Sequence, residues 1–152
     1  MLDAIVKLLL AIISLLNKPK VEPETIKPTS TKRITLEELY ALLKDKFPTA
    51  EIYLSDRDYL LCHYDDIALF LAQDETNKMT YIAEERDCDD FSYRLMGQFS
   101  IPDWSDLCFG IIWSTTHAEN VAITEDMKVV FVEPQNDQLS DTISGDIRFI
   151  MI

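Results

Sequence analysis

Three residues of types that cooperate in nucleophilic chemistry follow one another along the chain: Cys88, His117 and Glu133. A thiol is a strong nucleophile as the thiolate, which a histidine generates by taking the proton and later returning it to a leaving group. A carboxylate behind the histidine fixes the tautomer of the ring and stabilises its protonated form. These residue types in this order predict acyl transfer through a thioester on Cys88.

A predicted helix positions the thiol. Residues 87–97 show helical spacing of apolar residues, with Asp87 as the N-cap and Gly97 at the end. Cys88 then falls in the first turn, where unpaired backbone amides and the helix dipole favour a thiolate over a neutral thiol. The local sequence therefore predicts a reactive position for this cysteine.

Two predicted strands position the base and the acid. Residues 117–123 and 127–133 have β-prone composition, and a turn at Glu125 and Asp126 separates them. If the two strands form a hairpin around this turn, His117 pairs with Glu133. The imidazole and the carboxylate are then expected to be cross-strand neighbours.

The remaining elements predict an α+β domain with helices first and an antiparallel sheet after them. A capping box at Thr35 and Glu38 predicts a helix that ends before Pro48, and the acids before Ile67 predict a second helix start. The other strand candidates are 51–54, 59–63, 79–83, 108–113 and 147–152.

The first 33 residues of the chain differ from the rest. Residues 1–16 are almost wholly apolar but too short for a simple membrane span, so we expect a helix at a membrane interface, a short anchor, an oligomerising helix or a helix packed on its own domain. Prolines interrupt residues 17–33, which predicts an extended linker before a domain at 34–152. No small-x-small cleavage pattern follows the apolar stretch, so membrane association and a cytoplasmic location both stay open.

Charge and cysteine content exclude other classes of protein. The 152 residues carry a formal charge of −13, which opposes binding to nucleic acid. Residues up to Arg33 hold six basic and three acidic side chains, so the rest of the chain holds nearly all the negative charge. Three cysteines cannot all pair within the chain, which argues against a disulfide scaffold.

Three short segments carry a family resemblance: Asp87-Cys-Asp-Asp-Phe91, His117-Ala-Glu-Asn120 and Val132-Glu-Pro-Gln135. Together they resemble papain-like and transglutaminase-like cysteine peptidases, most closely the peptidase domain of the fairy-ring mushroom agglutinin and its phage and bacterial relatives. The resemblance covers about residues 59–140. It implies a papain-like fold, with Cys88 as nucleophile, His117 as base and Glu133 as orienting acid of a peptidase or amidase that acts on a peptide or peptidoglycan-like substrate.

Three acids beside the thiol raise a question of charge balance. Asp87, Asp89 and Asp90 would oppose the thiolate unless something neutralises them. Calcium takes carboxylate oxygens, and the resembling families include calcium-dependent members, so these three residues are the candidate calcium ligands. The alternative is a helix start whose acids interact with the dipole alone, and the thiol chemistry itself requires no cofactor.

A second function is also consistent with the sequence. The domain would keep a papain-like fold without catalysis and act as a binding or assembly module. Residues 1–16 would tether it to a membrane or to other copies, as in a phage-encoded accessory protein.

Overall fold

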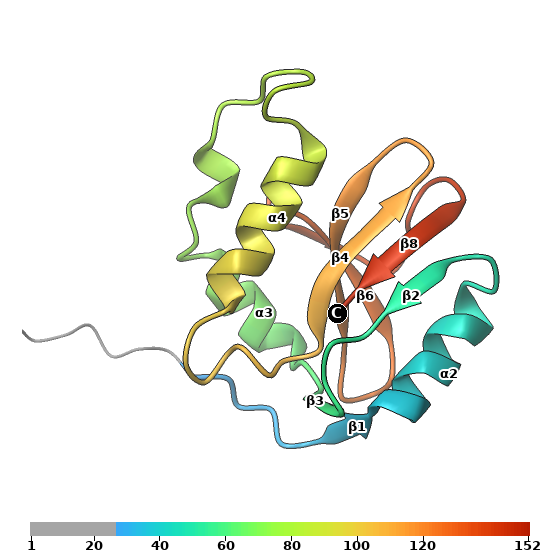
Figure 1. Cartoon of the computed structure of the whole chain (residues 1–152). Coiled ribbons are helices and arrows are strands. Elements are labelled where there is room, and N and C mark those ends of the chain that lie inside the picture. The colour runs from blue at the N-terminus through green and yellow to red at the C-terminus, as the bar shows by residue number, and fades with distance from the viewer. Residues whose placement is uncertain (1–26) are drawn as a thin grey trace, which may run out of the picture.

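The computed structural model describes residues 27–152 (Figure 1). Three α-helices are present in this range: α2 (Leu36–Lys46), α3 (Tyr64–Leu71) and α4 (Cys88–Phe99), with a short 3-10 turn, η1 (Thr76–Lys78). The strands are β1 (Arg33–Thr35), β2 (Glu51–Tyr53), β3 (Asp58–Leu60), β4 (Phe109–Ser114), β5 (Ala118–Ile123), β6 (Val129–Glu133), β7 (Gln138–Ser140) and β8 (Ile147–Met151).

Six of these strands form one sheet in the order β2-β8-β4-β5-β6-β7. Neighbouring strands are antiparallel except β2, which pairs in parallel with β8. The remaining strands, β1 and β3, form a separate antiparallel pair. The sheet is therefore mixed, and its edges are β2 and β7.

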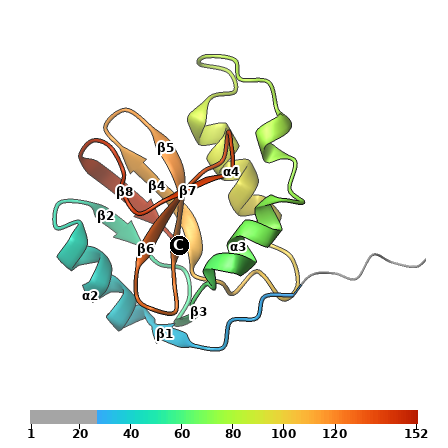
Figure 2. The same ribbon diagram turned by 180° about the vertical axis from the view of Figure 1, so that it is seen from behind.

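Helices α4 and α2 lie on opposite sides of this sheet, as both views show (Figures 1 and 2). Alternate residues of β5 point to opposite faces, so Val121 joins the core beneath α2 and Ala122 joins the core beneath α3 and α4. Leu43 of α2 and Leu95 of α4 are completely buried in these two cores. Burial on both faces explains why β4, β5 and β6 are nearly continuous apolar runs.

The starts of two helices follow directly from the sequence. Thr35 caps α2, and its hydroxyl accepts from the amide of Glu38 while the Glu38 carboxylate accepts from the amide of Thr35. Asp87 and Asp90 form the same reciprocal arrangement at α4. Each box satisfies amides that the helix itself leaves unpaired.

The predicted papain-like α+β arrangement, with N-terminal helices and then an antiparallel sheet, is wrong. Strands are the majority of the elements in residues 27–152; the first of them precedes every described helix, and β2 enters the large sheet beside β8 near the end of the chain. The predicted strand at 79–83 is also wrong, since this segment is irregular and forms only an isolated bridge between Ile82 and Arg86. Helix α4 continues past Gly97 to Phe99, because Gly97 does not adopt the left-handed conformation by which a glycine ends a helix.

Predictions for the N-terminus fall mostly outside the described residues. The apolar segment 1–16 lies outside them, and the partition into segment, linker and domain stays a prediction. Residues just before β1 contact the domain: the Thr29 amide donates to Asp66 at 2.7 Å, and the Thr31 amide donates to Glu125 at 2.7 Å. Within residues 27–152, no helix is both long and apolar enough to cross a bilayer.

Candidate functional site

The imidazole of His117 and the carboxylate of Glu133 are in direct contact. His117 Nε2 lies 2.6 Å from Glu133 Oε2, and the other carboxylate oxygen, Oε1, accepts from the backbone amide of Gln135 at 3.1 Å. Both carboxylate oxygens of Glu133 are therefore engaged, Oε1 by the Gln135 amide and Oε2 by the His117 ring. This geometry fixes the orientation of the imidazole.

The hairpin register that produces this contact differs from the predicted one. Asn120 pairs with Val132, so one further step places Glu119, not His117, level with Glu133. The turn is centred one residue later than predicted, and Met127 adopts a left-handed conformation in it (φ 62°). His117 consequently reaches Glu133 as a diagonal neighbour from just before β5.

Electrostatics favour a protonated ring at this position. The hydrogen bond to Glu133 raises the pKa of His117, and partial burial of the ring opposes that rise. Nε2 is occupied by Glu133, and within residues 27–152 no hydrogen bond engages Nδ1. Nδ1 is thus the nitrogen available to a thiol or a ligand.

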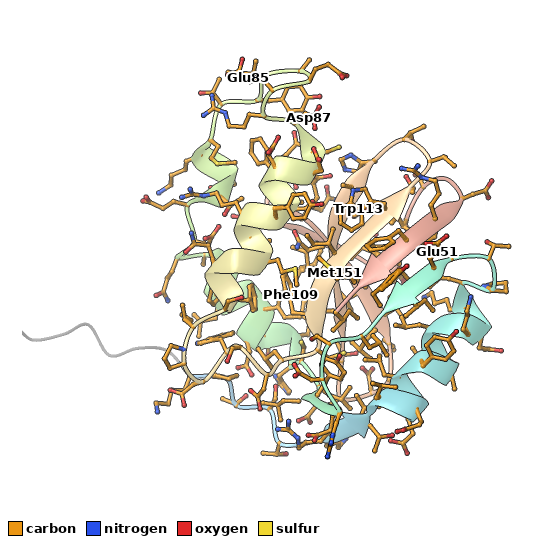
Figure 3. The ribbon with its side chains drawn as sticks, viewed as in Figure 1. Glu51, Glu85, Asp87, Phe109, Trp113 and Met151 are labelled. Carbon is orange, nitrogen blue, oxygen red and sulfur yellow. The ribbon has the colours of Figure 1, made fainter. Side chains whose placement is uncertain are left out.

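Cys88 lies in the first turn of α4 and is half-buried. The helix is tied to the sheet one turn further on, where Asn120 Nδ2 donates to the carbonyl of Ser92 at 3.0 Å. The start of α4, marked by Asp87, and the turn between β4 and β5 lie at the same end of the molecule (Figures 1 and 3). The structure joins the predicted base and acid directly, and among the described residues no hydrogen bond joins Cys88 Sγ to His117.

The acids beside Cys88 form a compact group. Ligand atoms of Asp87, Cys88 and Asp89 lie within 4.8 Å of one another. A hydrogen bond with Asp87 raises the pKa of Asp89, while the same bond lowers the pKa of Asp87. Asp90 is not part of this group, so only two of the three predicted calcium ligands, Asp87 and Asp89, lie together, and the calcium site stays a prediction.

An aromatic groove of about 480 Å³ crosses the sheet face next to α4. Trp113 of β4 contacts Tyr93 of α4 at a ring separation of 5.6 Å and Phe149 of β8 at 4.9 Å, and Tyr53 of β2 extends the row at 5.1 Å from Phe149. Glu51 and Arg148 supply charge along the groove; Glu51 and Trp113 are labelled in Figure 3.

The groove extends to the end of β4, where Trp113 pairs with Ala118 at the start of β5. Its lining does not include Cys88, His117 or Glu133.

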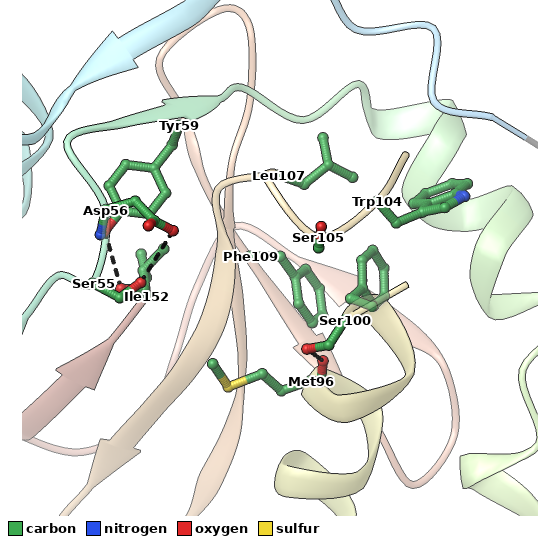
Figure 4. Close-up of a pocket in the computed structure, with 11 residues that line it drawn as sticks. Ser55, Asp56, Tyr59, Met96, Ser100, Trp104, Ser105, Leu107, Phe109 and Ile152 are labelled. Carbon is green, nitrogen blue, oxygen red and sulfur yellow. Dashed lines mark hydrogen bonds between the residues drawn. The ribbon is translucent and has the colours of Figure 1, made fainter. Parts of the chain in front are cut away.

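A second, smaller pocket of about 150 Å³ lies at the opposite end of α4 (Figure 4). Phe99, Trp104 and Phe109 form its apolar wall, and Ser100, the C-cap of α4, lies at its rim. Because Cys88 is at the other end of the helix, this pocket is separate from the thiol site.

Comparison with known proteins gives a likeness of fold. No family profile matches the sequence, and no curated protein matches it. Two solved structures are similar over 79% of this chain.

The fold is that of about half of a lectin chain. One structure, described as Polyporus squamosus lectin bound to the human-type influenza-binding epitope Neu5Acα2-6Galβ1-4GlcNAc, has a TM-score of 0.65 with 24% identity over 49% of its chain. The other, described as a PSL1a-E64 complex, has a TM-score of 0.66 with 24% identity over 51% of its chain. The chain thus spans about half the length of these structural neighbours.

These comparisons correct the family and function predicted from the motifs. The neighbour described by function is a lectin, so the assignment to papain-like or transglutaminase-like peptidases is withdrawn. Peptidase or amidase activity, peptide and peptidoglycan-like substrates, and the alternative of an inactive papain-like, phage-encoded module are withdrawn with it.

Sequence reasoning missed two residues of the site. Glu119 is half-buried beside His117 and Glu133, and burial raises its pKa to about 7. Asn120 is completely buried and connects α4 to the sheet through Ser92 and Gly110, a link that the sequence analysis does not predict. A polar residue inside the apolar run of β5 is the signal that marks both positions.

Proposed function

We propose that the domain carries a thiol site in which Cys88 is the nucleophile, His117 the base and Glu133 the residue that orients His117. The observation that supports it is the 2.6 Å contact between His117 Nε2 and Glu133 Oε2, with Glu133 held a second time by the Gln135 amide. This arrangement fixes one face of the ring and leaves Nδ1 for the thiol proton.

The chemistry requires the thiol to approach the ring. Cys88 lies at a helix start, where backbone amides favour negative charge on sulfur. Hydrogen bonds at such sites are often long without a bound ligand and shorten in the complex. The proposal requires the Cys88 sulfur to come within hydrogen-bond distance of Nδ1 when a ligand is bound.

The structural neighbour solved with E64 suggests a suitable electrophile. E64 is an epoxysuccinyl compound. In the proposed step the Cys88 sulfur attacks one epoxide carbon, the bond from that carbon to the ring oxygen breaks, and the released alkoxide takes the proton held by His117. The product is a thioether on Cys88, and the His117 imidazole is neutral again.

Mass spectrometry of intact and digested protein tests this proposal. We expect E64 to add once, at Cys88, with the rate reduced at least tenfold in His117→Gln and less strongly in Glu133→Gln. Cys62 and Cys108 are buried and serve as internal controls within the same chain. Modification that continues in Cys88→Ser, or a rate for wild type no greater than for His117→Gln, would overturn the proposal.

Carbohydrate binding is the second candidate function, and the aromatic groove favours it. A pyranose offers one flat C–H face that packs on an aromatic ring and hydroxyls that bond to charged side chains. Trp113 provides such a ring, and Glu51 and Arg148 provide the polar partners. The neighbouring lectin was solved with a sialylated trisaccharide, which makes that glycan the first ligand to test.

NMR titration with Neu5Acα2-6Galβ1-4GlcNAc separates this candidate from the first. We expect shifts at the Trp113 indole and loss of binding in Trp113→Leu. Tyr40→Leu is the matched control, because Tyr40 is an exposed aromatic residue on α2, away from the groove. Equal titration of both variants, or no shift at Trp113, would exclude the groove as the binding site.

A further inference from the structure

Glu119 is a half-buried carboxyl group for which no hydrogen-bond partner is recorded among residues 27–152. It lies two residues after His117, and the strand register places it level with Glu133 on the neighbouring strand. Glu133 in turn contacts the His117 ring at 2.6 Å, so Glu119 lies beside the His117–Glu133 pair. Two carboxyl groups thus accompany one imidazole.

We propose that Glu119 is a positioning residue of the thiol site, which acts through His117 by keeping its ring protonated beside the nucleophile. The inference rests on the proposed thiol site and adds a residue to it. Glu133 holds Nε2 by a direct hydrogen bond, whereas Glu119 acts through its charge alone.

Few charged groups face the Glu119 carboxyl group. Glu133 faces it from β6, and His117 faces it from the segment before β5. Its partner on β4 is the uncharged Ile112, and α4 packs on the opposite face of β5 through Asn120. The interaction therefore involves one imidazole and two carboxyl groups.

The burial of Glu119 and the charges around it also support an interaction between Glu119 and His117. Burial and the neighbouring Glu133 carboxylate raise the pKa of Glu119, whereas protonated His117 lowers it, and the result is about 7. Glu119 therefore becomes an anion as the pH rises through neutrality. This change adds negative charge beside the ring when His117 would otherwise begin to lose its proton.

NMR titration of the His117 ring tests the inference in the full chain. We expect Glu119→Gln to move the titration midpoint of His117 to lower pH and to remove a second inflection near neutral pH. Glu119→Asp should restore part of the inflection. Glu37→Gln is the control, because Glu37 is an exposed glutamate in the first turn of α2.

The pH profile of E64 addition is the second readout. We expect the alkaline limb for Glu119→Gln to move toward lower pH. An unchanged His117 midpoint in Glu119→Gln would overturn the role of Glu119 and leave the thiol site intact. Absence of any reaction at Cys88 would refute the thiol site, while the His117 midpoint would still decide whether Glu119 controls the charge of the ring.

Discussion

Substitution of Asn120 by aspartate should uncouple α4 from the sheet. Asn120 is completely buried, and its Nδ2 donates to the carbonyls of Ser92 at 3.0 Å and Gly110 at 3.0 Å. Asn120→Asp replaces this double donor with an oxygen that faces two carbonyl oxygens. A buried charge without a partner costs about 3–5 kcal/mol of unfolding free energy.

Asn120→Ala separates the lost hydrogen bonds from the added charge. Two hydrogen bonds contribute about 1 kcal/mol each, and Asn120 Oδ1 has no partner among the described residues, so its removal gives some relief. We therefore expect about 1–2 kcal/mol of destabilisation for alanine. The excess in the aspartate variant measures the cost of the charge.

The cost for aspartate should depend on pH. Burial raises the folded-state pKa of such a carboxyl group above its unfolded value of about 3.9, so the folded state binds the proton more tightly. Stability relative to wild type is then highest below pH 4 and falls as the pH rises through the interval between the two pKa values. Urea unfolding at pH 4 and pH 8, followed by tryptophan fluorescence, measures the difference. Equal destabilisation at both pH values would refute the reasoning.

Three further predictions concern the same region. Gly110→Ala should lower the melting temperature sharply in calorimetry, because a Cβ there would lie 1.9 Å from the Met151 carbonyl oxygen, and a small effect would contradict the close strand approach. Glu133→Gln should lower the pKa of His117, which NMR measures. Because that pKa is raised in the folded protein, the contact with Glu133 stabilises the fold fully below about pH 6.5, and this stabilisation is lost as the pH rises through the folded pKa. An equal loss of stability at pH 5 and pH 9 would contradict this role of Glu133. Calcium titrated into the protein should release heat in calorimetry that Asp89→Asn removes and Asp90→Asn reduces less, and identical heats for the three proteins would exclude this cluster.

The local elements of the fold could be predicted because their signals are local. The capping boxes at Thr35 and Asp87 mark helix starts through residues three positions apart, and both helices begin where expected. Strands β4, β5, β6 and β8 lie within two residues of their predicted limits, since apolar β-prone runs identify buried strands.

The order of the sheet could not be predicted in this way. Ile52 pairs in parallel with Ile150, and nothing in either short segment specifies a partner a hundred residues away. The hairpin centre was also misplaced, because Met127 adopts a left-handed conformation that is uncommon for a residue with a side chain. The motif that suggested a peptidase family consists of three short segments, too little sequence to determine the whole architecture.

The candidate site was predicted in part. His117 and Glu133 meet because neighbouring strands bring their ends together, which depends only on the hairpin. The position of Cys88 relative to them depends on how α4 packs on β5. Asn120 connects the two elements, and the sequence marks it as a polar residue in an apolar run but does not specify its partner Ser92. Long-range contacts of this kind decide which of the predicted site residues touch.

The acids around Cys88 oppose a thiolate less than their number suggests. Asp87 accepts the Glu84 amide at 3.1 Å, and Asp90 accepts the Asp87 amide at 3.2 Å, so both carboxylates already interact with backbone dipoles. The bond between Asp87 and Asp89 raises the pKa of Asp89, which favours a proton shared by this pair. A cation that binds there must displace the proton, so its affinity should increase with pH. If calcium binds at Asp87 and Asp89 as predicted, it would compete with the proton shared by this pair, and the competition would set the charge beside the sulfur.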